Sequence, residues 1–183
     1  NTLASCIHSL STKSRQGQRI ILALNLLPVI KYIKLNMTSP LHILHLEDNA
    51  NDASLVQARL KADGIASLIT RVQTREEFIA ALELGDFDLI FSDFTLPAFD
   101  GLTAIKIARA RQPNLPVILV SGSLGEERAI DSLKSGATDY VLKERLGRLV
   151  PAVRRAMQEV KERTERQRVE QLIQDERNFS EII

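Results

Sequence analysis

Residues 89–101, with the sequence LIFSDFTLPAFDG, begin as an apolar run and then bring in an aspartate. Phe91 and Phe94 flank this residue, Asp93, at the point where a buried strand would end. A carboxylate in such a place is costly unless a charged or hydrogen-bonding group meets it. The segment therefore predicts a buried strand that ends in a polar site.

Strand-like and helix-like segments alternate on both sides of this run. Strands are expected at residues 41–46, 66–72, 87–92, 116–121 and 138–142. Helices are expected at residues 51–63, 75–84, 101–111 and 126–135, and a last one from about Leu146 onward. This alternation predicts an α/β fold in which a doubly wound parallel sheet carries helices on both faces. In such sheets the ligand site lies outside the carboxyl ends of the strands.

Finer predictions concern two of these helices. Leu55, Ala58 and Ala62 mark the expected apolar face of the first helix. Thr74 and Glu77 have the spacing of a capping box at the start of the second.

The residues at which the strands stop are polar. The first strand stops at Glu47 and Asp48, the third at Asp93, the fourth at Ser121 and the fifth at Lys143. Clustered carboxylates repel one another when they lose water, so a bound cation is expected. Oxygen ligands in a partly solvated site favour Mg²⁺, which takes one or two carboxylates and a phosphate.

Such a set of residues has the chemistry of phosphoryl transfer. An aspartate can attack phosphorus and form an aspartyl phosphate, which is the role expected for Asp93. Mg²⁺, the ammonium of Lys143 and the hydroxyl of Ser121 would then neutralise the charge on the transferred oxygens.

Four motifs, taken in their order and spacing, resemble the receiver domain of two-component response regulators. They are LEDNANDA after the first strand, SDFTLPAFDG around the third, VSGS after the fourth and DYVLK after the fifth. The resemblance covers about residues 41–157. It implies a flavodoxin-like (βα)₅ fold with strand order 2-1-3-4-5, a cytoplasmic location, and phosphorylation by a histidine kinase or a phosphotransfer protein.

The resemblance also implies a role for each matching residue of the acceptor site. Asp93 matches the phospho-acceptor, and Lys143 matches the lysine that accompanies it. Glu47 and Asp48 match the acidic pair that holds Mg²⁺, together with Asp93 and the backbone carbonyl of Thr95.

Two further positions match the switch residues of the family. Ser121 matches the hydroxyl switch residue and Tyr140 the aromatic one. The sequence departs from the usual pattern at Phe94, which is bulkier than the common aliphatic residue, and at Glu144, where many relatives have proline.

Simpler explanations exist for several of these residues. Asp93 could be a capping carboxylate, and Tyr140 could be ordinary packing on an edge strand. His42 and His45 suggest a zinc site with Glu47, but the strand does not gather two histidines on one face and no cysteine lies near.

The composition narrows the class of protein. The chain has 183 residues, of which 44% are hydrophobic and 26% charged, and its formal net charge is +1, so we expect no nucleic-acid partner. Cys6 is the only cysteine, which rules out an intramolecular disulfide and suggests a reducing compartment. The apolar segment at residues 20–30 is too short to cross a membrane as a helix.

Both ends of the chain carry extensions to the expected receiver domain at residues 38–157. Residues 1–37 are either extra sequence ahead of a native start at Met37 or a docking helix. Residues 158–183 are expected to be a helical linker or coiled coil, because apolar residues recur in the last helix at alternating spacings of three and four. We expect this helix to form a homodimer. The final segment, ERNFSEII, is similar to the opening of a PAS domain, which suggests the N-terminal part of a longer signalling protein.

The expected function is therefore a receiver module that switches on phosphorylation and signals through its C-terminal helix. Its catalysis would be limited to its own phosphorylation and dephosphorylation, without an external substrate. One alternative is a dimerisation or docking module that keeps the fold without switching. Another is a flavodoxin-like cofactor binder or Mg²⁺-dependent phosphohydrolase, but EDNAND stands where FMN would want a Ser-, Thr- or Gly-rich loop.

Overall fold

The computed structural model describes residues 39–97, 99–122 and 126–180. These residues belong to one compact unit, Ser39–Ile183. The predicted N-terminal extension at residues 1–37 lies outside the described residues, as does the end of the predicted PAS-like segment.

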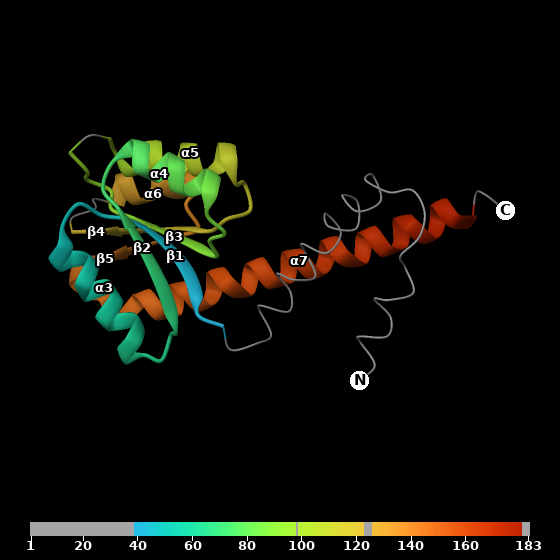
Figure 1. Cartoon of the computed structure of the whole chain (residues 1–183), viewed down its shortest axis with the longest axis horizontal. Helices are drawn as coiled ribbons and strands as arrows, with labels where there is room; N and C mark the ends of the chain where they lie inside the picture. Colours follow the sequence, from blue (N-terminus) through green and yellow to red (C-terminus); the bar gives the residue numbers. More distant parts are fainter. Residues whose placement is uncertain (1–38, 98, 123–125, 181–183) are drawn as a thin grey trace, which may run out of the picture. The chain divides into compact units, whose positions relative to one another are not determined.

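Five parallel strands form a single sheet (Figure 1). They are β1 (Leu41–Leu46), β2 (Ser67–Val72), β3 (Leu89–Ser92), β4 (Val117–Ser121) and β5 (Asp139–Leu142). Their order is β2-β1-β3-β4-β5, which confirms the predicted doubly wound, flavodoxin-like topology. The strand order reverses between β1 and β3, and the carboxyl ends of these two strands are where such sheets bind ligands.

Helices cover both faces of the sheet, with α4, α5 and α6 on one face and α3 and α7 on the other (Figure 1). Their bounds are α3 Ala50–Ala62, α4 Arg75–Leu84, α5 Gly101–Arg111, α6 Glu126–Lys134 and α7 Leu149–Ser180, with a 3₁₀ segment, η1, at Lys143–Arg148. The extended C-terminal helix is thus confirmed, although it begins after a 3₁₀ segment rather than near Leu146. No helix in the described part of the chain is long and apolar enough to cross a membrane.

Alternate residues of the central strands build two hydrophobic layers. Toward α4 and α5 the sheet contributes Leu44, Leu46, Ile90, Val117 and Leu119. Toward α3 and α7 it contributes Ile43, Leu89, Phe91, Ile118 and Val120. All of β4 is buried, as expected for a strand covered on both faces.

The predicted capping box of α4 is present. The side-chain oxygen of Thr74 accepts a hydrogen bond from the backbone N–H of Glu77 at 3.2 Å, and the Glu77 carboxylate accepts one from the N–H of Thr74 at 3.4 Å. These two bonds satisfy backbone donors that the first turn of the helix leaves free.

The predicted apolar face of α3 is wrong. Leu55 is 57% exposed, and Ala58 and Ala62 are exposed as well. Val56 and Leu60 face the core instead, with exposed fractions of 1% and 0%. Two sets of apolar residues in α3 have helical spacing. The packing of the helix against the sheet decides which of the two sets is buried.

Candidate functional site

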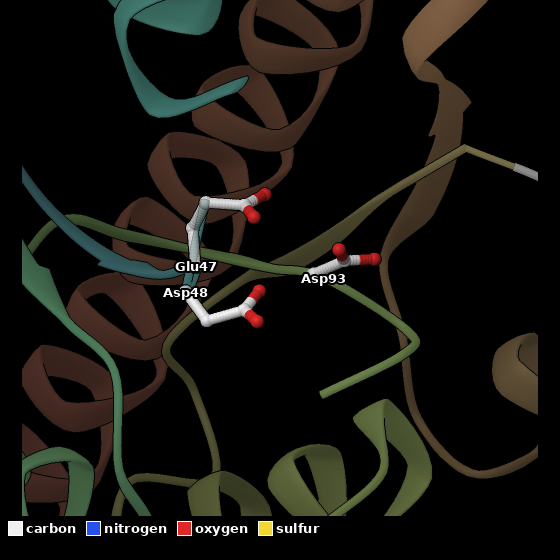
Figure 2. Close-up of side chains that lie close together, drawn as sticks. All are labelled: Glu47, Asp48 and Asp93. Atoms are coloured by element: carbon white, nitrogen blue, oxygen red, sulfur yellow. The ribbon is translucent and has the colours of Figure 1, made fainter. Parts of the chain in front are cut away.

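Three carboxylates meet at the carboxyl ends of β1 and β3 (Figure 2). Glu47 and Asp48 follow β1 and Asp93 follows β3, and one oxygen of each lies within 4.8 Å of the others. The backbone N–H of Asp93 donates to the carbonyl of Leu46 at 2.9 Å, so sheet pairing itself brings the two strand ends together. The structure thus brings the three sequence-predicted acidic residues together at the carboxyl ends of β1 and β3.

The ammonium of Lys143, directly after β5, contacts three carboxylates. Its Nζ lies 2.8 Å from Glu47 Oε2, 2.8 Å from Asp93 Oδ2 and 2.6 Å from Asp52 Oδ2. Burial lowers the pKa of Lys143, but the hydrogen bonds to these carboxylates outweigh it, and the pKa lies above its ordinary value. Lys143 is therefore a permanent cation of the site.

Glu47 is fully buried, with an exposed fraction of 0%. Burial raises the pKa of this carboxyl, even though Lys143 and the Asn49 N–H, which donates to Oε1 at 3.0 Å, act in the opposite direction. A buried carboxylate beside two others favours a further cation. The ligand set is three carboxylates, without either histidine, and it suits a hard ion such as Mg²⁺.

Asp93 is almost buried, with 6% of its surface exposed. Its Oδ1 accepts a hydrogen bond from the backbone N–H of Thr95 at 3.2 Å, while its Oδ2 faces Lys143. Thr95 thus reaches the aspartate through its N–H, and the metal-ligand role of its carbonyl stays a prediction. The Phe94 side chain packs in the hydrophobic core between the sheet and helices α4 and α5, and it is 6% exposed.

Ser121 lies on β4, which pairs with β3, and Tyr140 lies on β5, which pairs with β4; neither residue donates to Asp93 in the described part of the chain. Ser121 ends β4 and is 2% exposed, and its Oγ has no hydrogen-bond partner among the described residues. Tyr140 pairs with Leu119 on the edge strand β5 and packs, half-buried, against the α4 and α5 layer. Ser121 therefore ends the strand that pairs with β3, and Tyr140 lies one strand further from Asp93.

Two residues of the site were missed by the sequence analysis. Asp52, on the first turn of α3, contacts Lys143. Arg71, on β2, donates to the backbone carbonyls of Glu47 and Asp48, each at 2.9 Å, and so fixes the strand end that carries them. Asp52 comes four residues after Asp48, on the first turn of α3, and could have been suspected, but nothing in the sequence singles out Arg71.

Sequence comparison shows the class of protein. A family model described as the response regulator receiver domain matches residues 43–154, and the chain belongs to this family. It is 28% identical over 121 residues to the cell cycle transcriptional regulator CtrA of Caulobacter vibrioides, covering 63% of this chain and 52% of CtrA. It is 27% identical over 101 residues to the transcriptional regulatory protein ZraR of Salmonella typhimurium, covering 55% of this chain and 22% of ZraR. The match thus spans about half or less of these relatives.

Solved structures show the same fold. NtrX from Brucella abortus has a TM-score of 0.64 at 25% identity, over 72% of this chain and 30% of NtrX. A CheY-like receiver domain protein from Methanospirillum hungatei has a TM-score of 0.60 at 24% identity, over 68% of this chain and 99% of that one.

Proposed function

We propose that this receiver domain accepts a phosphoryl group on Asp93 from a phosphohistidine of a cytoplasmic histidine kinase or phosphotransfer protein. The observation that carries the proposal is the position of Asp93. It is nearly buried at the switch point of the sheet, its Oδ2 is 2.8 Å from the Lys143 ammonium, and two more carboxylates lie within 4.8 Å.

The chemistry needs little beyond these groups. A carboxylate oxygen of Asp93 forms a bond to phosphorus while the phosphorus–nitrogen bond of the donor breaks, and the imidazole leaves with the electron pair. Lys143 neutralises charge on the transferred oxygens, and the unpaired hydroxyl of Ser121 can donate to one of them. Mg²⁺ held by Glu47, Asp48, Asp93 and the carbonyl of Thr95 would supply further neutralisation.

The phosphoryl group would bias an equilibrium between two conformations of the domain. Ser121 and Tyr140 are the proposed switch residues, because Ser121 ends β4, which pairs with the acceptor strand β3, and Tyr140 lies on β5, which pairs with β4. β5 packs against α7, and Arg155 of α7 forms an ion pair with Asp139 of β5. The signal would therefore leave through α7, which we propose also joins two copies of the chain.

Incubation of the chain with acetyl phosphate and Mg²⁺, followed by intact mass measurement, tests the proposal. We expect a gain of one phosphoryl group that disappears in Asp93→Asn and when the metal is chelated. Asp88→Asn is the matched control, because Asp88 binds the N–H of His42 at 2.9 Å near the opposite end of β3. A wild-type chain that gains no mass with any phosphodonor would instead support a docking module without switching.

A further inference from the structure

Lys143 has three carboxylate partners, and two of them are proposed ligands of the metal. Glu47 and Asp93 belong to the acidic cluster, whereas Asp52 does not belong to the group found among the described residues. We propose that Asp52 is a positioning residue that keeps Lys143 at the site when Glu47 and Asp93 engage a cation. This inference rests on the proposed function and adds to it a residue from α3.

The contact with Asp52 is the shortest of the three. Its Oδ2 lies 2.6 Å from the Lys143 Nζ, compared with 2.8 Å for the other two carboxylates. The Asp52 side chain is 28% exposed and that of Lys143 is 16% exposed, so the pair is only partly screened by water. Charge-assisted hydrogen bonds of this kind are stronger than neutral ones.

Helix capping does not account for Asp52. An acidic residue at the third helical position usually accepts from the N–H of the N-cap residue. Here the N-cap is Asn49, and its N–H donates to Glu47 Oε1 at 3.0 Å. The Asn49 side chain in turn accepts from the N–H of Asn51 at 2.9 Å, so α3 is capped without Asp52. The Asp52 carboxylate is left to bind Lys143.

A cation at the cluster and the ammonium of Lys143 compete for the same two carboxylates. Like charges that share ligands repel, so binding of the cation favours a lysine that has moved part of its contacts elsewhere. Asp52 already contacts the Lys143 ammonium at 2.6 Å, so Lys143 can keep this partner when Glu47 and Asp93 turn to the cation. Without Asp52, the ammonium would depend on Glu47 and Asp93 alone and would compete with the cation for both.

The first test compares Mg²⁺ affinity of the full chain with that of Asp52→Asn, by titration followed in ¹H–¹⁵N spectra without a phosphodonor. We expect a roughly three- to tenfold weaker affinity, in the range of one partly buried charged contact. Asp52→Glu, which keeps the charge, should recover most of it. Asp63→Asn is the matched control, because Asp63 ends the same helix and pairs with Arg59 at 2.8 Å, and it should bind Mg²⁺ as the wild type does.

The second test asks whether Asp52 acts through Lys143. The ¹⁵N resonance of the Lys143 ammonium should shift in Asp52→Asn and not in Asp63→Asn. In a Lys143→Gln background, Asp52→Asn should change Mg²⁺ affinity by less than about twofold, because the coupled partner is gone.

An unchanged Lys143 resonance with unchanged Mg²⁺ affinity in Asp52→Asn would overturn the inference. So would an equal loss in the Asp63→Asn control, or a full effect that persists in the Lys143→Gln background. A wild-type chain that gains no phosphoryl group would overturn the proposed function alone, since the resonance and affinity measurements use no phosphodonor.

Discussion

Gly101 lies against the backbone of the proposed acceptor. A Cβ atom there would be 2.9 Å from the carbonyl oxygen of Asp93 and 2.9 Å from the Cα of Phe94, and backbone atoms cannot rotate away. We therefore expect Gly101→Ala to lower the free energy of unfolding by about 1–3 kcal/mol in urea titrations, as overpacking does.

The matched control for this substitution is Gly147→Ala. A Cβ at Gly147 meets nothing within 4 Å, so its effect should stay within about 0.5 kcal/mol. Equal stability of the Gly101 and Gly147 variants would show that the loop after Asp93 yields more easily than the distances indicate.

His45 is buried beside Phe91 with both ring nitrogens unpaired among the described residues. Burial lowers its pKa from 6.5 to about 4, with Lys143 and Arg71 acting in the same direction. The unfolded chain then binds more protons between these two pKa values, so stability falls as the pH falls through this window. We expect the metal-free wild type to lose about 2 kcal/mol more than His45→Leu between about pH 7 and pH 5, measured by urea unfolding.

Parallel acid sensitivity of wild type and His45→Leu would contradict this prediction. The wild type and His45→Leu both keep every carboxylate of the site. The difference between their losses of stability therefore reports on the imidazole alone.

Single residues differ in how well the sequence predicted them. Asp93 and Lys143 each follow a short apolar run that identifies a strand. Because parallel strands have their carboxyl ends at one edge of the sheet, the two residues were expected to lie together. Asp52 went unnoticed because its role depends on which way a helical side chain points. The burial of His45 was not predicted either, because a histidine in a strand is expected to be at least partly exposed until the tertiary structure shows which helices cover it.

Helix α7 consists of a buried part and an exposed part. Its buried residues are Leu149, Val150, Ala152, Val153 and Ala156. Beyond them Val169, Leu172 and Ile173 are 46% to 59% exposed. These residues resume the apolar spacing that the sequence analysis assigned to a partner helix, and a second copy of α7 would cover them.

Truncation after Met157 tests the proposed homodimer. The shorter chain keeps the buried residues that α7 has in the described part of the chain, so it should fold. We expect it to be monomeric while the full chain is dimeric in light scattering. In the full chain Leu172→Glu should weaken the dimer. Gln167→Glu, which adds the same charge at a polar position, is the control and should leave the dimer unchanged. Identical oligomeric states of the two chain lengths would exclude dimerisation through this part of α7.

The bounds of most elements were predicted to within one or two residues, because turn and cap residues mark them locally. Thr74 with Glu77 begins α4 where predicted. The buried face of α3 was predicted in the wrong phase, because that choice depends on the sheet. The 3₁₀ segment Lys143–Arg148 before α7 was also not predicted.

The whole molecule should become more stable when the site binds a cation. Ligands that bind only the folded state stabilise it by about 2.7 kcal/mol at a hundredfold excess over Kd. We expect Mg²⁺ to raise the melting temperature of the wild type in calorimetry, and chelation to reverse the rise. Asp48→Asn should remove most of this effect, because the exposed Asp48 belongs to the cluster but makes no contact with Lys143 in the described part.

A similar rise in Asp48→Asn would mean that Mg²⁺ acts elsewhere on the chain. Asp63→Asn serves again as the control that removes an acidic residue away from the strand ends.

The sequence by itself determined the order of strands and helices, the two-sided burial of β4 and the gathering of Glu47, Asp48, Asp93 and Lys143. Periodicity and turn residues are local signals that mark the elements, and parallel strands bring their carboxyl ends to one edge of the sheet. Only the tertiary structure decided that Asp52 shares Lys143 with the acidic cluster, that Arg71 supports the end of β1, and that Phe94 fills the core. These contacts join segments distant in sequence or depend on the direction of a side chain. The spacing of residues along the chain predicts neither of these.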